Sequence, residues 1–478
     1  MLDYHAKFAD RLFFDAVCAA AASDERPVPR RALLSLVDQR LRPISGGMWN
    51  TAEANRPNRE ALTMLADLLK QDAAPFLLSA FREELDRNVF HETRCRILFL
   101  LQEFSVWPAT EYFYRTAAAD ERFDAQAVYV PFSHESAAGE DPSFEDYQAA
   151  GIPVRRCHEY DLARENPDVV VFTKPYDSIP KQFYISEVEK IAKYTIYVPY
   201  GLELNKSLLR YGFQDYTHYA AWRHLAYGGI VKAFGTRYGY RNGENIAVWG
   251  HPRVDSYHPR NKAAFHDSEW EARIAGRKVI LWCPHHTIMP GPECVSTWLD
   301  NHEAILSFFA GRKDAVLLWR PHPLLFGAIV NNGIMTQPEL NAFLAEVRKC
   351  ENIILDQTSD YRTAFAMSDA IITDGTTFSI EYLLTGKPLM VTTRSLEAFY
   401  EPEEMEKALY IGKTHDDIRA FIENVLAGND PRIEERLAYA DRLFLRLPDK
   451  TVSENILDNI LLDIRNEVQL QIKKATGA

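Results

Sequence analysis

The segment that decides the fold is Ser368-Asp369-Ala370-Ile371-Ile372-Thr373-Asp374-Gly375-Thr376-Thr377-Phe378-Ser379-Ile380-Glu381-Tyr382-Leu383-Leu384-Thr385-Gly386-Lys387-Pro388. Its pattern predicts a buried strand, a short polar turn, a helix that ends at a glycine, and the start of another strand. The turn from Asp374 to Thr377 brings hydroxyls and free backbone N–H groups to the start of that helix, which suits a diphosphate. An ordinary strand–turn–helix connection with a hydroxyl N-cap has the same pattern, so both interpretations stay open.

The composition favours a globular protein of the reducing cytoplasm. Of the 478 residues, 47% are hydrophobic and 25% are charged, and no apolar run reaches the ~18 residues that a membrane-spanning helix needs. The six cysteines are scattered without a C-x-x-C pair, which argues against a disulfide framework and a zinc site. The net charge of −13 argues against nucleic acid as the main partner. The first residues lack a secretory signal pattern, and we expect a cytoplasmic protein.

The chain divides into three expected parts. Residues 1–90 carry apolar residues at helical spacing and predict a helical module without a catalytic constellation. Residues 91–260 and 261–478 each alternate short apolar runs with helical stretches, which is typical of doubly wound, largely parallel α/β sheets. We therefore expect an α/β fold with two Rossmann-like domains facing a cleft, an N-terminal helical extension, and an amphipathic C-terminal helix.

Polar side chains follow three of the predicted strands in residues 261–478. His285 and His286 follow the first, Arg320 and His322 follow the second, and Asp374 follows a later one. Because ligands of open α/β sheets lie beyond the carboxyl ends of the strands, we expect these groups to meet at one edge. Arg320 could then hold a phosphate through two parallel hydrogen bonds. His322, fixed between two prolines, could donate to the diphosphate or protonate a leaving oxygen.

Several other chemistries lack sequence support. No H-E-x-x-H, G-x-S-x-G or Walker A motif is present, and no G-x-G-x-x-G follows the first strand of residues 91–260. His251, in Trp249-Gly250-His251-Pro252-Arg253-Val254-Asp255, predicts a turn at the boundary between the two domains, where Arg253 could pair with Asp255.

Five segments give the chain a resemblance to the CDP-glycerol glycerophosphotransferase family, the teichoic-acid and capsule polymerase type of GT-B enzyme. They are Arg96–Trp107, Gly250–Asp255, Trp282–Thr287, Arg320–Pro323 and Ser368–Pro388. The resemblance implies a metal-independent, cofactor-free enzyme with a nucleotide-activated alcohol bound mostly by the C-terminal domain. It implies that His322 contacts the diphosphate, that Thr376 and Thr377 stand where the family has serines, and that Glu381 holds the ribose. The full set of expected nucleotide contacts is His285, His286, Arg320, Asp374, Thr376, Thr377, Ser379 and Glu381.

One departure from the family concerns the general base. The family usually carries a histidine at the end of a strand in the N-terminal domain, and Tyr200 of Val198-Pro199-Tyr200-Gly201 stands there in this chain. Tyrosine, with a pKa near 10, is a poor base at neutral pH. Gln102, Glu103 and Tyr200 all follow strands of this domain and are expected on the acceptor side, and Glu103 is the alternative base.

The leading hypothesis is a transferase that moves a glycerol-phosphate or related polyol-phosphate group from a CDP-activated donor. Its acceptor would be a cell-surface polymer or a lipid-linked molecule, with a possible peripheral contact to the membrane. Three alternatives use the same fold: a nucleotide-sugar glycosyltransferase of surface polysaccharide synthesis, a UDP-GlcNAc 2-epimerase-like enzyme, and a nucleotide-binding subunit with altered catalysis. The sequence does not identify the base, the acceptor, the oligomeric state or the role of residues 1–90.

Overall fold

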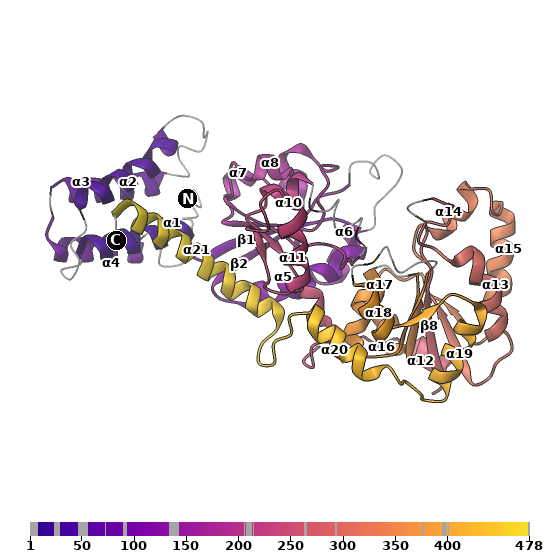
Figure 1. Ribbon diagram of the computed structural model, residues 1–478. Helices are drawn as coiled ribbons and strands as arrows, with labels where there is room; N and C mark the ends of the chain where they lie inside the picture. Colours follow the sequence, from indigo (N-terminus) through magenta and orange to yellow (C-terminus); the bar gives the residue numbers. More distant parts are fainter. Residues whose placement is uncertain are drawn as a thin grey trace.

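The structure is a computed structural model that describes residues 8–22, 29–45, 56–71, 73–88, 93–132, 143–204, 206, 213, 215–261, 265–291, 294–374, 377–393, 399 and 401–476. Figure 1 shows a helical module and two α/β domains arranged in a row, with the helical module beside the N-terminal domain. The predicted fold class is confirmed. Thr376 lies outside the described residues.

The N-terminal domain is built on a parallel sheet that has seven strands among the described residues, in the order β3-β2-β1-β4-β5-β6-β7. β1 lies between β2 and β4, and its apolar run is therefore buried, as the sequence predicted. The strands are β1 (Cys95–Leu101), β2 (Phe123–Tyr129), β3 (Val154–Arg156), β4 (Val169–Phe172), β5 (Tyr194–Tyr197), β6 (Arg223–Leu225) and β7 (Ile246–Ala247).

The C-terminal domain is built on a second parallel sheet, with six strands among the described residues in the order β10-β9-β8-β11-β12-β13. Its strands are β8 (Lys278–Cys283), β9 (Ala315–Trp319), β10 (Ile353–Leu355), β11 (Ala370–Thr373), β12 (Leu389–Thr392) and β13 (Tyr410–Gly412). β8 pairs with both β9 and β11, so the carboxyl ends of these three strands are neighbours.

Helices surround both sheets. In the N-terminal domain and the segment after it they are α5 (Glu111–Ala119), α6 (Ser143–Ala149), α7 (Leu162–Glu165), α8 (Ile185–Val188), α10 (Tyr216–Ala220) and α11 (Gly229–Tyr238), with 3-10 turns η1 (Phe104–Ala109), η2 (Cys157–Glu159), η3 (Lys181–Phe183) and η4 (Pro252–Tyr257). In the C-terminal domain they are α12 (Ser268–Ile274), α13 (Trp298–Phe309), α14 (Leu325–Asn331), α15 (Gln337–Arg348), α16 (Arg362–Met367), α17 (Thr377–Glu381), η6 (Tyr382–Thr385), α18 (Pro402–Ala408), α19 (His415–Leu426) and α20 (Ile433–Leu443).

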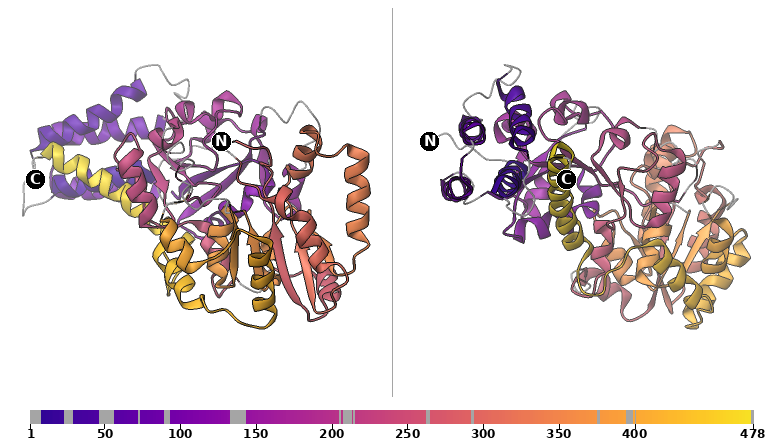
Figure 2. Two further views of the ribbon diagram at one scale, coloured as in Figure 1. Left: turned by 45° about the vertical axis from the view of Figure 1, so that its right-hand side comes forward. Right: turned by 60° about the vertical axis from the view of Figure 1, so that its left-hand side comes forward.

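The C-terminal helix α21 (Val452–Thr476) joins the parts of the molecule. It contacts α5 and η4 of the N-terminal domain, and it then packs on α1 (Phe8–Ala22) and α2 (Arg30–Ser45) of the helical module. Figure 2 shows the yellow helix α21 lying along the indigo helices of that module, which also contains α3 (Arg56–Lys70) and α4 (Pro75–Asn88). Val468 and Ile472 belong to the same buried cluster as Phe13, Leu65 and Leu78, so the last helix completes the core of the first module.

Candidate functional site

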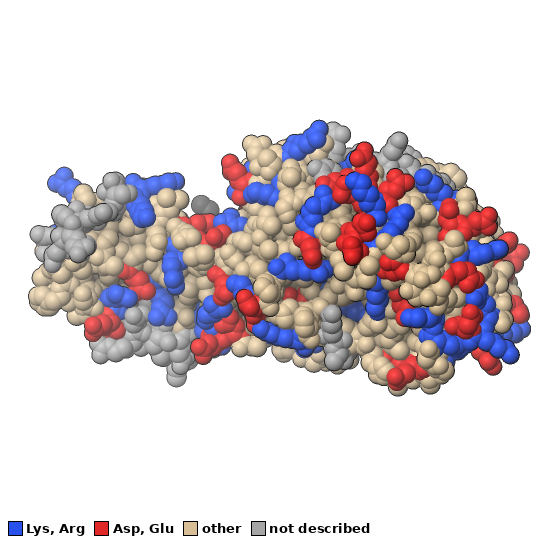
Figure 3. All heavy atoms as spheres, turned by 60° about the horizontal axis from the view of Figure 1, so that its bottom comes forward, with Lys and Arg blue, Asp and Glu red and all other residues tan. Residues whose placement is uncertain are grey.

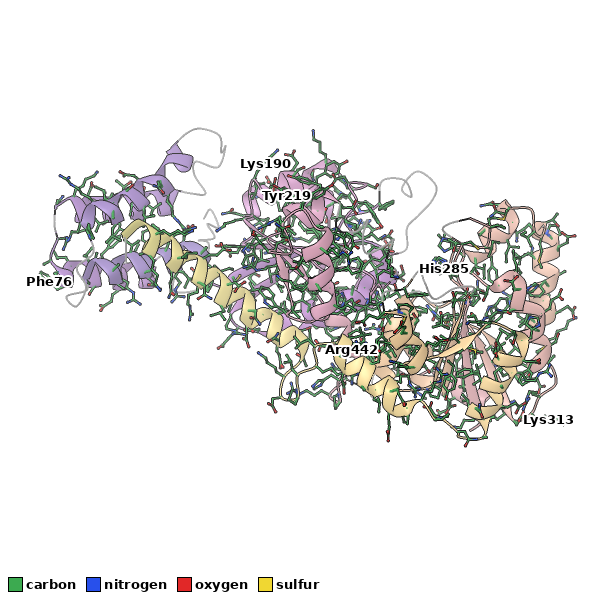
Figure 4. All side chains as sticks on the ribbon, in the orientation of Figure 1. Phe76, Lys190, Tyr219, His285, Lys313 and Arg442 are labelled. Atoms are coloured by element: carbon green, nitrogen blue, oxygen red, sulfur yellow. The ribbon has the colours of Figure 1, made fainter. Side chains whose placement is uncertain are left out.

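Three segments of the C-terminal domain meet beyond the carboxyl ends of β8, β9 and β11. The backbone N–H of His285, after β8, donates to Asp374 Oδ2, after β11, at 2.7 Å. The backbone N–H of His322, after β9, donates to the carbonyl of Pro284 at 3.0 Å. Figure 4 shows His285 on the side of its domain that is turned toward the N-terminal domain. The predicted meeting of these segments is thus present in the structure.

The imidazoles of His285, His286 and His322 form a cluster, which we call the histidine cluster. The ring centroid of His286 lies 4.3 Å from that of His285 and 4.2 Å from that of His322, and the third pair is 5.0 Å apart. Burial lowers the pKa of His285 to about 3 and that of His322 to about 4, with further lowering by the neighbouring imidazoles. Burial also lowers the pKa of His286. The three rings are therefore neutral at pH 7 in the unliganded site.

Backbone contacts decide where two of these rings carry their proton. His322 Nδ1 accepts the N–H of Leu324 at 3.1 Å, and His285 Nδ1 accepts the N–H of Thr287 at 3.3 Å. A neutral ring that accepts at Nδ1 carries its hydrogen on Nε2. Both rings therefore offer a neutral N–H donor at Nε2, which suits the oxygens of an anion.

The same cluster is also the one group of described residues whose spacing fits a metal ion. One ring nitrogen from each histidine lies within 4.8 Å of the other two. A metal ligand needs an unprotonated nitrogen, however, and the Nδ1 atoms of His285 and His322 already accept backbone N–H groups. The hydrogen-bond pattern therefore favours an anion over a cation at this place.

Asp374 holds the segment after β8 in place and joins it to residues 296–297 and to β12. Its buried carboxylate accepts the hydroxyls of Thr297 and Thr392 at 2.6 and 2.9 Å, in addition to the N–H of His285. Ser296 Oγ donates to it at 3.2 Å and the Thr297 N–H at 3.1 Å. Burial raises the pKa of this carboxyl, while these hydrogen bonds act in the opposite direction. Asp374, predicted to contact a nucleotide, serves to position the histidine segment.

Arg320 is likewise engaged within the protein. Its guanidinium forms a buried ion pair with Asp356 and donates to the hydroxyl and the carbonyl of Thr358. The Arg320 guanidinium, which the sequence analysis assigned to a phosphate, thus binds the segment that follows β10. We assign Arg320 to positioning that segment rather than to a phosphate.

Thr377 and Ser379 lie on α17, directly after the turn that contains the histidine-binding Asp374. A Cβ added to Gly201 of the N-terminal domain would meet Thr377 Oγ1 at 3.0 Å, so the two domains touch at this hydroxyl. Ser379 is fully buried, whereas Thr377 is partly exposed. Of the two, Thr377 is therefore the residue that can face a ligand at the junction.

Glu381, expected to hold a ribose, forms the centre of a buried network between the domains. Its carboxylate pairs with Arg253 and accepts the hydroxyls of Tyr257 at 3.1 Å and Tyr361 at 2.6 Å. Arg253 also donates to the carbonyl of Tyr200, which continues the network into the N-terminal domain. Glu381 accordingly acts as a positioning residue at the junction of the two domains. We call this group of Glu381, Arg253, Tyr257 and Tyr361 the hinge network.

The expected pair of Arg253 and Asp255 is wrong. Asp255 instead accepts the backbone N–H groups of Val452 at 2.7 Å and Ser453 at 2.8 Å, at the start of α21. The two residues are two positions apart in a 3-10 turn, and their side chains have different partners. Arg253 binds Glu381, whereas Asp255 caps α21. His251 is buried beside them and its Nε2 contacts the carbonyl of Pro199 at 2.7 Å.

The N-terminal domain contributes polar groups after β1, β4 and β5. Glu103 forms an ion pair with Lys174, a residue that the sequence analysis did not single out. The Lys174 ammonium lies 5.8 Å from the centroid of the Tyr200 ring, and Tyr200 shares a hydrogen bond of 3.1 Å with Tyr176. Burial raises the pKa of Tyr200 above its usual value, so this phenol is an even weaker base than free tyrosine. Gln102 is buried, and its Nε2 has no partner among the described residues.

A second contact between the domains was also missed from the sequence. Arg362 of α16 pairs with Glu111 of α5 at 2.6 Å, and with Asp360 at the same distance. Arg362 and Glu111 are 5% and 13% exposed, so the pair is shielded from solvent and holds the two domains in one orientation. No sequence spacing could link residues so far apart in the chain.

Residues 229–462 match the family described as CDP-Glycerol:Poly(glycerophosphate) glycerophosphotransferase. The matched range is a little under half of the chain and agrees with the resemblance expected from the sequence. The matched range contains the histidine cluster, Thr377, Arg253 and Glu381, and the match supports a transferase of the CDP-glycerol glycerophosphotransferase type. No curated protein matches the chain in sequence.

Solved structures of other proteins share the fold of this chain. A variant of the wall teichoic acid polymerase TagF soaked with CDPG is 16% identical with a TM-score of 0.51, over 78% of this chain and 90% of that one. A putative UDP-N-acetylglucosamine 2-epimerase from Listeria monocytogenes is 14% identical with a TM-score of 0.55, over 79% and 98%. The UDP-GlcNAc 2-epimerase from Neisseria meningitidis bound to UDP-GlcNAc is 12% identical with a TM-score of 0.51, over 77% and 100%.

The surface and the helices add two findings. Figure 3 shows lysine, arginine and acidic side chains interspersed over the face that it displays. In the part of the chain that the structure describes, none of the helices combines the length and the apolar character that a bilayer crossing requires.

Proposed function

We propose that the protein transfers a glycerol-phosphate or related polyol-phosphate group from a CDP-activated donor to a hydroxyl of a cell-surface polymer or lipid-linked acceptor. The observation that carries the proposal is the histidine cluster, which lies within the residues that match the glycerophosphotransferase family. Neutral N–H donors in a partly buried site bind diphosphate oxygens and stabilise the charge that develops on a leaving phosphate.

In this proposal the donor diphosphate lies against His285, His286, His322 and Thr377. The acceptor oxygen attacks the β-phosphorus and forms a new P–O bond, while the bond to the nucleotide phosphate breaks and its electron pair leaves with CMP. His322 Nε2–H stabilises the departing oxygen. Glu103 takes the proton of the acceptor hydroxyl, because Tyr200 remains protonated.

A UDP-GlcNAc 2-epimerase-like function is the second candidate. The fold likeness to two such enzymes over nearly their whole length supports it. The family match over residues 229–462 favours the transferase. The two candidates differ in the nucleotide, since one needs a CDP-linked alcohol and the other a UDP-sugar.

A thermal-shift panel of CDP-glycerol, CDP-ribitol, CMP and UDP-sugars tests the donor. A ligand at a hundredfold excess over its dissociation constant stabilises the folded state by about 2.7 kcal/mol. We expect the largest shift with CDP-glycerol or CDP-ribitol, and we expect His322→Ala and Thr377→Ala each to reduce it. A larger shift with a UDP-sugar would favour the second candidate, and an unchanged shift in both variants would remove the assigned pocket.

A further inference from the structure

Lys174 lies where the ends of four neighbouring strands of the N-terminal sheet meet. It follows β4, it forms an ion pair with Glu103 after β1, and its ammonium lies 5.1 Å from the ring centroid of Phe132 after β2. The ring of Tyr200, after β5, is 5.8 Å away. The Lys174 side chain is 12% exposed, which is unusual for a lysine and indicates a fixed position.

The ion pair uses only one side of the Glu103 carboxylate. Lys174 contacts Oε1, whereas Oε2 is buried without a hydrogen-bond partner among the described residues. A buried polar atom without a partner is costly, so such an atom in a native structure indicates a place that water or a ligand fills. Oε2 therefore retains an unused capacity to accept a hydrogen bond.

This carboxylate lies next to the junction of the two domains. Tyr200, whose ring faces Lys174, is followed by Gly201, and Gly201 lies against Thr377 of the donor side. The carbonyl of Tyr200 is fixed by Arg253 of the hinge. The segment of Tyr200 and Gly201 thus contacts both Lys174 and the proposed donor site.

We infer that Lys174 is a positioning residue that holds the Glu103 carboxylate with Oε2 turned to the acceptor hydroxyl, and that this pair does the work of the histidine missing from the N-terminal domain. The inference rests on the proposed transfer. The acceptor proton passes to Oε2 as the acceptor oxygen forms its bond to phosphorus, and Glu103 later releases that proton to water. The ion pair with Lys174 keeps the carboxylate oriented for this transfer.

The kinetic test measures CMP release from CDP-glycerol with a soluble glycerol-terminated acceptor. Removal of a general base reduces the rate by about 10²–10⁴-fold, so Glu103→Gln should lower kcat in that range. Lys174→Met should lower kcat at least about tenfold with the KM for CDP-glycerol within about twofold, and Lys174→Arg should recover most of the loss. The double variant should be no slower than Glu103→Gln alone, because a positioning residue acts through its partner.

Lys193 provides a matched control in the same domain. It also pairs with a glutamate, Glu467, at 2.6 Å and lies 5.0 Å from the centroid of a tyrosine ring, that of Tyr194, but away from the strand ends. Lys193→Met should leave kcat unchanged. Adding formate to Glu103→Ala should restore part of the rate, since a small carboxylate can occupy the vacated place of a base.

The outcomes separate this inference from the proposed function. If both Glu103→Gln and Lys174→Met still respond to CDP-glycerol in thermal shift but lose transfer, the pair and the donor site both stand. If Lys174→Met keeps its kcat, or if the double variant loses rate as the product of the single losses, Lys174 does not act through Glu103 and the inference is overturned while the transfer stands. If the native protein neither binds CDP-glycerol nor transfers from it, the proposed function fails and takes the inference with it.

Discussion

At the scale of single residues, the polar groups after the strands divide into two sets. His285, His286, His322 and Thr377 leave donor or hydroxyl groups for a ligand, whereas Asp374 and Glu381 use their oxygens on the protein itself. Buried charges are stable only when partners satisfy them, so the second set fixes the backbone that carries the first. Asp374 and Glu381 thus form a hydrogen-bonded frame that holds the histidines and Thr377 in place.

The frame should be sensitive to the loss of Asp374. Asp374→Ala leaves the His285 N–H and the Thr297 N–H without their acceptor. Since each buried unsatisfied group costs about 1–3 kcal/mol, we expect the free energy of unfolding to fall by about 2–4 kcal/mol in urea titration. Asp314→Ala is the control because Asp314 is 60% exposed and pairs with Arg312, and it should change stability by less than about 0.5 kcal/mol. Equal effects in both variants would contradict the framing role.

The sequence predicted the position of the site better than the use of its side chains. The rule for strand ends places His285, His322 and Thr377 at one edge, because parallel neighbours end on the same side. It could not show that Arg320 pairs with Asp356, since that contact depends on how a later segment packs. Lys174 was missed because a lysine after a strand resembles an ordinary surface residue in sequence. Its place two residues after a fully apolar strand was the available signal.

At the scale of secondary-structure elements, the helix α21 depends on a cap from the hinge. Asp255 of η4 accepts the first two N–H groups of α21, and burial raises the pKa of its carboxyl while the hydrogen bonds lower it. The hinge that carries Arg253 is therefore fixed to the helix that crosses the molecule. Motion of one element requires adjustment of the other.

Removing this cap should loosen α21 first. Asp255→Ala should reduce the free energy of unfolding by about 1–2 kcal/mol, as loss of an N-cap does, and should speed amide exchange in the first turns of α21. Asp267→Ala is the matched control, since Asp267 caps α12 at the Trp270 N–H at 2.8 Å and its loss should speed exchange in α12 alone. Exchange in α21 that is unaltered by Asp255→Ala would show that packing, not the cap, holds its start.

Three short strands were not predicted from sequence patterns. β6, β7 and β13 contain three, two and three residues, which is too few for a recognisable apolar period. They form because a neighbouring strand already offers its backbone, as β5 does for β6 and β12 for β13. Their existence is a property of the completed sheet rather than of the local sequence.

At the scale of the whole molecule, buried neutral histidines should make the fold sensitive to acid. Burial lowers the pKa of His218 and of His251 to about 3, well below the ordinary 6.5. Below pH 6.5 the unfolded chain therefore binds protons that the folded chain does not, and stability falls as the pH falls. Each such group contributes a slope of up to about 1.4 kcal/mol per pH unit between pH 6.5 and its folded pKa.

Urea titrations between pH 7 and pH 5 measure this dependence. We expect the midpoint to fall steadily below pH 6.5, and we expect His218→Phe to make the decline less steep, because the ring stacks on His224 at 4.8 Å and needs no proton. A midpoint that stays constant over this range would contradict the assignment of neutral buried rings.

The helix α21 also sets an order of events during synthesis. Val468 and Ile472 of α21 fill the hydrophobic centre shared by α1 to α4, which are synthesised long before α21. These four helices therefore keep apolar faces uncovered until α21 has been synthesised. A stalled or prematurely terminated chain would expose this unfilled groove, and the cell's quality-control proteases would have a ready means of telling it from the finished product.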